Sequence, residues 1–398
     1  MLAQQVRLLA RAQVCARAAD ELASSADLAA AAAAIGGAPL NYDAYCTLRE
    51  AVSPKIARYL TASLFARLPR GGGGDVAPRA LLAYVREAEV LRAVYARLAL
   101  FDGAGDGWLR EAEVENYVYA AMPAVPDLAA LQESFAAFYV FTAVRALFFH
   151  LDPHRTGRVA LRALAGSRVF AEWLAVLPAG HPDLGPAGAP PPPGDDAVPP
   201  RAPPRAANWF LPASALRVYA SYLALDADQN GMLSVDELAG YGGGAYTRAF
   251  AARVFEEAHT YAAAGGGAPE IDYKAFLDVV LATENRGSPP ALRFFFRLLD
   301  VRHQGWFGLP EIRAFYALVA ERLVELGHEA VDAGNVADEI LDMAAPAAPG
   351  RVTLQDLRAC KVGGTVVGLL FDAAAFVAYD TREEAAQAGA RDADADEP

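Results

Sequence analysis

The sequence predicts an all-α protein made of consecutive helix–loop–helix units in two halves. Apolar residues recur at steps of three and four in several segments, which is the period of a helix with one buried face. The clearest of these segments are 141–150, 216–225, 249–257 and 291–299. Alternating runs long enough for strands are missing, and a proline-rich stretch at 178–207 divides the helical pattern in two.

Composition limits the class of protein. The chain has 398 residues, of which 54% are hydrophobic and 21% charged, so it is long enough for roughly two to three domains with a sizeable core. The net charge of −13 argues against binding to nucleic acid or to an anionic membrane surface. No apolar run reaches the roughly 18 residues that a membrane span needs. Cys15, Cys46 and Cys360 form no CxxC pair, which indicates a reducing, cytoplasmic location.

The same composition predicts the domain organisation. The prolines and glycines at 178–207 predict a linker or loop, because proline removes backbone donors and fixes φ. This segment separates an N-terminal domain at 40–177 from a C-terminal domain at 208–381. Residues 1–39 are expected to form an N-terminal helical or flexible segment, and the acidic tail at 382–398 is expected to be disordered.

One stretch of the C-terminal half, LDADQNGMLSVDELAGYG at 225–242, has the pattern of a twelve-residue calcium loop. Calcium is a hard cation that takes roughly six to eight oxygen ligands, and the glycine at position 6 permits the sharp turn that a Cβ would obstruct. The expected ligands are the side chains of Asp226, Asp228, Asn230, Ser234 and Glu237 and the backbone carbonyl of Met232. This set predicts calcium binding in the range of about 10⁻⁷–10⁻⁵ M, and magnesium fits less well because it prefers rigid six-coordination.

Three further stretches resemble the same loop but lack ligands. Residues 102–113 keep acids at positions 1, 5 and 12, but Arg110 occupies position 9. Residues 300–311 keep acids at positions 1 and 12, but Arg302 at position 3 places a guanidinium where it competes with a metal for the carboxylates. Residues 152–163 keep only the first aspartate and the glycine. The sequence leaves open whether 102–113 and 300–311 bind a metal weakly.

Weaker frames at 69–80, 264–275 and 345–356 extend the pattern to seven loops. Position 8 is apolar in all seven, where it is Val76, Leu109, Val159, Leu233, Ile271, Phe307 or Val352. This position supplies no ligand, and we expect it to join neighbouring loops through a short β-bridge. The sequence therefore predicts a string of EF-hand-like units, most of which have lost their metal and serve as structural corners.

The chain shows no constellation that is typical of an enzyme. Its six histidines form no HExxH pattern, and His150 and His154 are separated by Asp152 and Pro153, where a helix ends. The segment GAGDG at 103–107 imitates a nucleotide-binding loop, yet no strand precedes it and it lies inside a calcium-like frame. Neither GxxxxGK[ST] nor GxSxG occurs. A binding or regulatory role fits these residues better than catalysis.

Several stretches carry a resemblance to a known family. They are NWFLPASALRVYASYLALDADQNGMLSVDELAGYG (208–242), IDYKAFLDVVLATENRGSPPALRFFFRLLD (271–300), VADEILDMAAP (336–346) and VTLQDLRACKVGGTVVGLLFDAAAFVAYDTRE (352–383). They closely resemble the B double-prime regulatory subunits of type-2A serine/threonine protein phosphatase, most of all the gamma-type members and their plant counterparts, Fass or Tonneau. The resemblance runs from about residue 40 to 385, and the segment WFLPASALRVY beside the calcium loop makes it specific.

This resemblance implies a non-catalytic subunit that docks on the scaffold and catalytic subunits of the phosphatase and directs them to substrates. In plant and algal relatives the implied address is the microtubule cytoskeleton, with a role in cell division, and in animal relatives it includes the centrosome and the nucleus. The implied partners therefore include microtubule- or centrosome-associated proteins, and the implied location is cytoplasmic and cytoskeleton-associated.

The resemblance also bears on single residues. It carries calcium ligation onto Asp226, Asp228, Asn230, Met232 and Glu237. Candidates for contact with the scaffold subunit are Trp209, Phe210 and Pro212, against a core role for the two aromatic residues.

Two other functions stay open at the level of sequence. The chain would act without a phosphatase either as an EF-hand calcium sensor or buffer, or as a cytoskeletal scaffold. A buffer is expected to have several tight sites, whereas this chain offers one complete loop.

Overall fold

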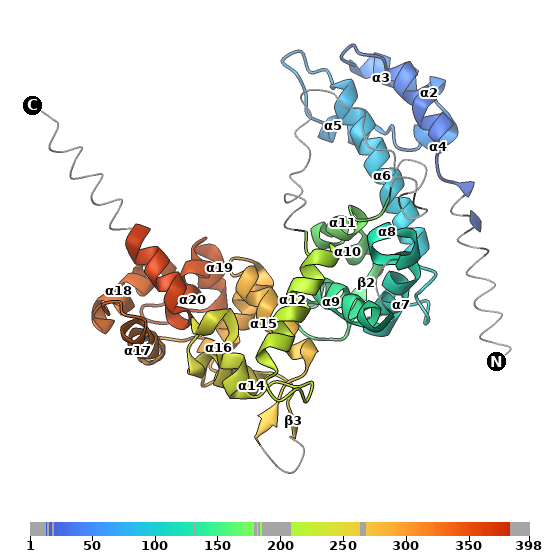
Figure 1. The fold of residues 1–398 in the computed structure, drawn as a ribbon. Coiled ribbons are helices and arrows are strands. Elements are labelled where there is room, and N and C mark those ends of the chain that lie inside the picture. Colours follow the sequence, from blue (N-terminus) through green and yellow to red (C-terminus); the bar gives the residue numbers. More distant parts are fainter. Residues whose placement is uncertain are drawn as a thin grey trace, which may run out of the picture. The chain divides into compact units, whose positions relative to one another are not determined.

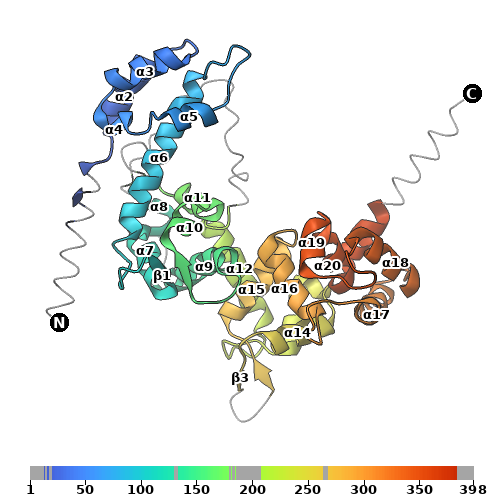
Figure 2. The same cartoon turned by 180° about the vertical axis from the view of Figure 1, so that it is seen from behind.

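The computed structural model describes residues 20–129, 133–178, 208–262 and 268–382, together with positions 13, 16, 17, 181 and 184. These residues are mostly helical, and the strands among them are only two or three residues long (Figures 1 and 2). The prediction of an all-α protein is therefore confirmed. The expected linker and tail lie almost entirely outside the described residues. None of the described helices is both long enough and apolar enough to cross a bilayer.

The chain forms two compact units, Met1–Ala215 and Leu216–Pro398, and each is described by itself. The elements of the first unit are α2 (Ser25–Ile35), α3 (Tyr42–Ala51), α4 (Pro54–Ala57), α5 (Ala62–Arg67), α6 (Pro78–Leu98), β1 (Trp108–Arg110), α7 (Glu111–Ala121), η1 (Met122–Ala124), α8 (Pro126–Ala129), α9 (Glu133–Leu151), β2 (Arg158–Ala160), α10 (Leu161–Ala165) and α11 (Arg168–Leu174). The division between the units falls inside α12 (Pro212–Leu225).

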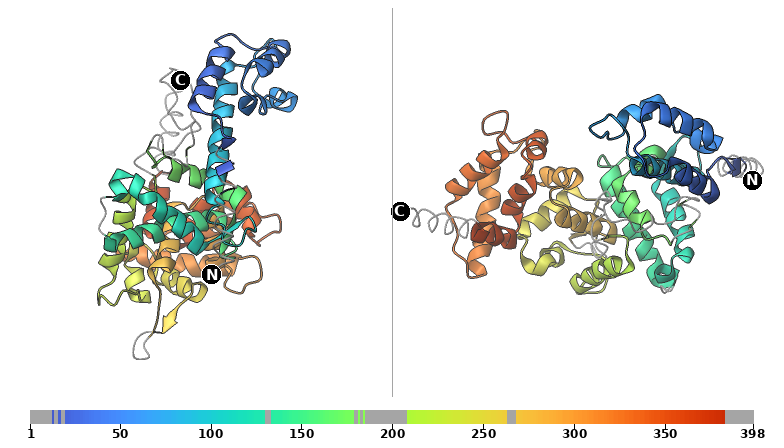
Figure 3. Two further views of the ribbon diagram at one scale, coloured as in Figure 1. Left: turned by 90° about the vertical axis from the view of Figure 1, so that its right-hand side faces the viewer. Right: turned by 90° about the horizontal axis from the view of Figure 1, so that it is seen from above.

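The second unit contains the rest of α12 and a further series of short elements. They are α13 (Val235–Ala239), η4 (Tyr241–Gly244), α14 (Arg248–Glu257), β3 (Tyr261–Ala262), β4 (Pro269–Glu270), α15 (Tyr273–Glu284), α16 (Pro289–Leu299), α17 (Leu309–Glu325), α18 (Ala333–Ala344), α19 (Leu354–Ala359) and α20 (Gly363–Phe371). Helical residues continue from 373 to 382. The β3 strand projects from the helices of this unit (Figure 3).

The helices α2 to α6 close around one apolar core that also contains a buried carboxylate. Glu89 on α6 is fully buried. Its side chain accepts hydrogen bonds from the Tyr59 hydroxyl at 2.6 Å, from the Arg58 guanidinium at 2.6 Å and from the Ala23 amide at 2.8 Å. A buried charge is tolerated only when it is paired and hydrogen-bonded, as this one is. The contact with Ala23 ties the segment before α2 to α6.

Aromatic side chains fill the core of the second unit. Phe371 lies against Phe250, Phe295 and Phe315 with ring centroids 5.3, 6.0 and 5.0 Å apart. Tyr222 on α12 is buried, and the centroid of its ring lies 5.3 Å from that of Phe276 on α15. The aromatic residues of the helical segments in this unit thus serve mainly as core, because their rings bury large apolar areas.

The loops meet in pairs through position 8, as the sequence predicts. Each contact is antiparallel, and the paired residues are Leu109 with Val159 in the β1–β2 sheet, Leu233 with Ile271, and Phe307 with Val352. Val76 also forms bridges, but its partners are Leu40, which lies outside the seven predicted frames, and Arg70 of its own loop. The frames at 102–113, 226–237 and 300–311 each therefore have the next frame along the chain as their partner.

At the start of α12, the structure supports the core role for Phe210 over scaffold contact. Phe210 is fully buried, its ring lies 6.0 Å from that of Trp173, and its carbonyl accepts a 2.7 Å hydrogen bond from the Tyr139 hydroxyl. A side chain packed in this way has no surface to offer a partner, so Phe210 is a core residue and not a scaffold contact. Trp209 is half-buried, and its indole donates to the Thr142 carbonyl at 3.4 Å. Residues 208–215 belong to the first unit, whereas the sequence places the C-terminal domain from 208 onward.

Candidate metal centre

The predicted calcium loop connects two helices of the second unit. Helix α12 ends at Leu225, and α13 begins at Val235 with Ser234 as its N-cap. The chain turns between them because Gln229 and Gly231 adopt positive φ values of 59° and 81°. Glycine reaches this region without steric cost. The Tyr222 hydroxyl on α12 donates a 2.7 Å hydrogen bond to the Gly231 carbonyl and so holds the turn against the incoming helix.

The first half of the loop folds its side-chain oxygens inward onto its own amides. Both carboxylate oxygens of Asp226 accept, one from the Asn230 amide at 3.1 Å and the other from the Gly231 amide at 3.0 Å. Asp228 accepts from the Asn230 amide at 3.1 Å, and the Asn230 side-chain oxygen accepts from the Met232 amide at 2.7 Å. Each bond uses one lone pair of its oxygen and leaves the other available.

The second half of the loop is closed by Glu237. One of its oxygens accepts from the Ala227 amide at 2.9 Å, and the other accepts from the amide and the hydroxyl of Ser234, both at 2.8 Å. Burial opposes ionisation of this carboxyl, but the hydrogen bonds from Ser234, Ala227 and Asp228 outweigh it and lower the pKa of Glu237. The carboxylate is therefore ionised and held over both ends of the loop.

Three acidic side chains converge in this loop. The carboxylate oxygens that Asp226, Asp228 and Glu237 can offer lie within 4.8 Å of one another, and no other group of three potential ligands of this kind occurs among the described residues. Two oxygens that each lie about 2.4 Å from one ion are at most about 4.8 Å apart. The three carboxylates thus fit a hard divalent cation of the size of calcium.

Two of the other predicted ligands, Asn230 and Ser234, lie beside these acids. Asn230 donates its side-chain amide to Asp228 at 3.1 Å, and the Ser234 hydroxyl donates to Glu237. Sequence reasoning missed one residue, Glu270 of the partner loop, which accepts from the Asn230 amide at 3.0 Å. The signal for it was present, because Glu270 is an acid one position before the predicted bridge residue Ile271.

The degenerate loops keep the fold of the turn, but each contains an arginine side chain close to its carboxylates. In loop 102–113 the Arg110 guanidinium lies 3.7 Å from Asp106 and 3.6 Å from Glu113. In loop 300–311 the Nε of Arg302 lies 3.5 Å from Glu311. A guanidinium at this distance neutralises a carboxylate that a metal would need. Both arginines therefore act against metal binding.

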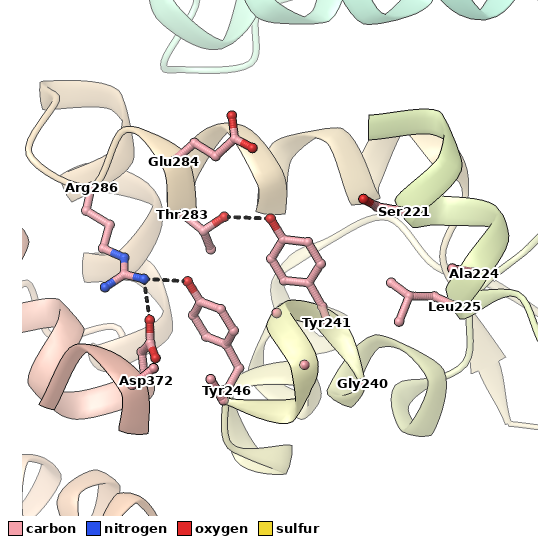
Figure 4. A pocket seen from close by; sticks show the side chains of 14 residues that line it. Ser221, Ala224, Leu225, Gly240, Tyr241, Tyr246, Thr283, Glu284, Arg286 and Asp372 are labelled. Carbon is pink, nitrogen blue, oxygen red and sulfur yellow. Dashed lines mark hydrogen bonds and ion pairs between the residues drawn. The ribbon is translucent and has the colours of Figure 1, made fainter. Parts of the chain in front are cut away.

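A cavity of about 630 Å³ lies beside the helices that flank the candidate loop (Figure 4). Several polar side chains that line it are paired with one another by hydrogen bonds and an ion pair. Arg286 donates to the Tyr246 hydroxyl at 2.8 Å and pairs with Asp372, while the Tyr241 hydroxyl and that of Thr283 are 3.2 Å apart. Burial raises the pKa of Tyr246, so its phenol is protonated. These contacts tie the segment after α13 to the ends of α15 and α20.

Comparison with known proteins identifies relatives over most of the chain. The gamma-type B'' regulatory subunit of serine/threonine-protein phosphatase 2A from Xenopus tropicalis is 38% identical over 347 residues, which cover 87% of this chain and 72% of the relative. The human protein of the same name is 36% identical over the same length. TON2 of Arabidopsis thaliana, a probable B'' regulatory subunit of the same phosphatase, is 30% identical over 401 residues, covering 97% of this chain and 80% of the relative.

The fold also has a counterpart among solved structures. A chain from a PP2A PR70 holoenzyme superposes with a TM-score of 0.55 at 19% sequence identity, covering 69% of this chain and 94% of that one. At this identity the likeness concerns the fold alone. No protein-family model matches the chain.

Proposed function

Because this chain belongs to the B'' family of regulatory, non-catalytic subunits of serine/threonine-protein phosphatase 2A, we propose that it docks on the scaffold and catalytic subunits of that phosphatase and directs the holoenzyme to its substrates. Two observations support the docking. The relatives that match over most of the chain are named as regulatory subunits, and a fold of the same kind occurs in a PP2A PR70 holoenzyme.

The proposal includes one calcium ion bound by loop 226–237. The observation that carries it is the convergence of Asp226, Asp228 and Glu237 within 4.8 Å of one another. Asn230, Met232 and Ser234 complete the proposed ligand set with a side-chain amide oxygen, a backbone carbonyl and a hydroxyl. Calcium suits these ligands because it is a hard cation that prefers oxygen and accepts irregular geometry.

We propose a cellular role in the organisation of microtubules and in cell division, with a cytoplasmic, cytoskeleton-associated location. Support comes from the sequence similarity to the plant relative TON2, which extends over nearly the whole chain. Microtubule- or centrosome-associated proteins are the proposed additional partners. A tagged full-length chain should follow the microtubules in the cell, and a diffuse distribution that ignores their depolymerisation would contradict this part of the proposal.

Affinity capture tests the docking, and the two buffers show whether docking depends on calcium. The full-length chain is used as bait in a cell extract, with free calcium or with a calcium chelator, and Glu237→Gln serves as a matched variant. We expect the phosphatase scaffold and catalytic subunits in the eluate of the wild-type chain. Their absence under gentle conditions in both buffers would defeat the docking proposal.

A further inference from the structure

Glu270 reaches from the partner loop into the candidate calcium loop. Its Oε1 accepts a hydrogen bond of 3.0 Å from the side-chain amide of Asn230. The same amide nitrogen donates to Asp228 at 3.1 Å, and the amide oxygen accepts from the Met232 amide at 2.7 Å. The nitrogen of the Asn230 side chain is thus held by two carboxylates, and its oxygen is held by the Met232 amide.

The backbone places Glu270 at this point. Its neighbour Ile271 forms the β-bridge with Leu233, with hydrogen bonds of 2.9 Å in both directions. Both bridge residues are fully buried. Glu270 itself ends β4, which pairs with β3 through Tyr261. Because the bridge fixes the register of the two loops, it places the half-buried carboxylate of Glu270 beside the side chain of Asn230.

The two degenerate loop pairs carry the opposite charge at the equivalent position. Arg158 and Arg351 each stand one residue before the bridge residue of their loop, as Glu270 does. The Arg158 guanidinium lies over the ring of Trp108 at 4.8 Å, and that of Arg351 lies over the ring of Trp306 at 4.8 Å. In each pair, the residue before the bridge in the second loop therefore contacts the first loop. It is acidic only opposite the loop that has a full set of oxygen ligands.

We propose that Glu270 is a positioning residue of the calcium site, which sets the orientation of the Asn230 amide so that its oxygen faces the ion. This inference rests on the proposed binding of calcium by loop 226–237. An amide that is free to rotate offers its nitrogen, a donor that repels a cation, as readily as its oxygen. A carboxylate at Glu270 accepts only from the nitrogen side. Together with Asp228 on the same nitrogen and the Met232 amide on the oxygen, it removes that ambiguity before the ion arrives.

The charge of Glu270 acts in the same direction. Asp226, Asp228 and Glu237 bring three negative charges to the loop. Glu270 adds a fourth carboxylate in contact with a ligand residue. An arginine at this position, as in the other loop pairs, would instead donate to the amide oxygen of Asn230 and repel the ion.

Calorimetric titration of the full-length chain with calcium tests the positioning role. We expect Glu270→Ala to weaken calcium binding about tenfold and Glu270→Arg up to about a hundredfold, the range seen for residues that orient metal ligands. Glu270→Gln keeps the acceptor oxygen and should retain most of the affinity. The matched control is Asp236→Ala, an exposed acid next to Glu237 that pairs with Arg248 at 2.8 Å instead of with Asn230.

Two results of the titrations would overturn the inference. One is a Glu270→Ala affinity no weaker than that of the Asp236→Ala control, and the other is a Glu270→Gln affinity as weak as that of Glu270→Ala. A double-mutant cycle with Asn230→Ala provides the specific readout, because a residue that acts through Asn230 should lose most of its effect when Asn230 is truncated. Equal effects of Glu270→Ala in both backgrounds would assign it a role independent of Asn230.

The titrations also distinguish a failure of the proposed calcium site from a failure of the positioning role of Glu270. If wild type binds no calcium, both proposals fall together. If wild type binds and Glu237→Gln does not, while Glu270→Ala binds like wild type, only the positioning role fails. Thermal unfolding in chelator, where all variants should match wild type closely, separates a loss of affinity from a loss of fold.

Discussion

Loops 226–237 and 300–311 belong to the same unit and share the same turn, yet only the first gathers oxygens. The first aspartate accepts from two backbone amides in both loops, at 3.1 and 3.0 Å for Asp226 and at 2.9 and 2.7 Å for Asp300. The glycine at position 6 has φ 81° in one and 84° in the other. The aspartate at position 1 and the glycine at position 6 thus give both loops the same turn.

The two loops differ in what occupies the centre. In loop 226–237 the third position is Asp228 and the cross-loop contact comes from Glu270. In loop 300–311 the third position is Arg302, whose guanidinium lies near Glu311, and the cross-loop contact is the stacking of Arg351 on Trp306. Loop 300–311 thus keeps the turn although an arginine stands near its closing carboxylate where loop 226–237 has an aspartate at position 3.

The largest effect is expected from truncating the bridge residues. Phe307→Ala should lower the free energy of unfolding by about 3–5 kcal/mol and Leu233→Ala by about 2–5 kcal/mol, since both side chains are fully buried. Calcium at a hundred times Kd should return about 2.7 kcal/mol to any variant that keeps the site. Phe307→Ala should receive all of this increment and Leu233→Ala less of it. Denaturant unfolding with calcium and with chelator measures the loss of stability and the stabilisation by calcium for each variant. Equal stabilisation of the two variants by calcium would mean that the Leu233 bridge does not affect the calcium site.

The next effect concerns the ion itself. Glu237→Gln exchanges one carboxylate oxygen for an amide and should weaken calcium binding about a hundredfold, which is about 2.7 kcal/mol. The equivalent change Glu311→Gln should leave calcium binding unaltered, because loop 300–311 is proposed to hold no ion. Calorimetry of both variants decides the point, and unchanged binding by Glu237→Gln would mean that the ion is bound elsewhere.

Much of this arrangement follows from local sequence. Aspartate at position 1, glycine at position 6 and an acid at position 12 predict the turn wherever they occur, because the interactions that form it lie within the loop itself. The prediction that position 8 pairs the loops is confirmed at Leu109, Leu233 and Phe307. An apolar residue between polar neighbours at a fixed register has few other ways to be buried.

The remaining features depend on segments distant in the sequence. Leu40 as partner of Val76 belongs to no recognisable frame, so the pattern could not identify it. The burial of Phe210 depends on Trp173 and Tyr139, on the far side of the predicted linker. Glu270 lies in a frame with few ligands, and its relation to Asn230 becomes visible only when the bridge sets the two loops side by side.

A designed restoration sharpens the comparison. Arg302→Asp combined with Gln304→Asn gives loop 300–311 oxygen ligands at positions 3 and 5, beside the existing Asp300 and Glu311. We expect the calcium stoichiometry to rise from one to two, with the new site weak, at about 10⁻⁴–10⁻³ M, since Arg351 stays opposite. Arg302→Gln alone is the control and should add no site. A stoichiometry that stays at one in the double variant would show that positions 3 and 5 are not what the loop lacks.

The smallest effect should come from the stacked arginines. Arg351→Gln removes the contact with Trp306 and should lower the free energy of unfolding by about 0.5–1 kcal/mol, the usual value for an exposed cation–π pair. Calcium affinity should stay the same, because Arg351 belongs to the loop pair without a proposed ion. Arg158→Gln should behave likewise through Trp108. A larger loss, or a change in calcium binding, would mean that this position couples the loop pairs instead of closing each one separately.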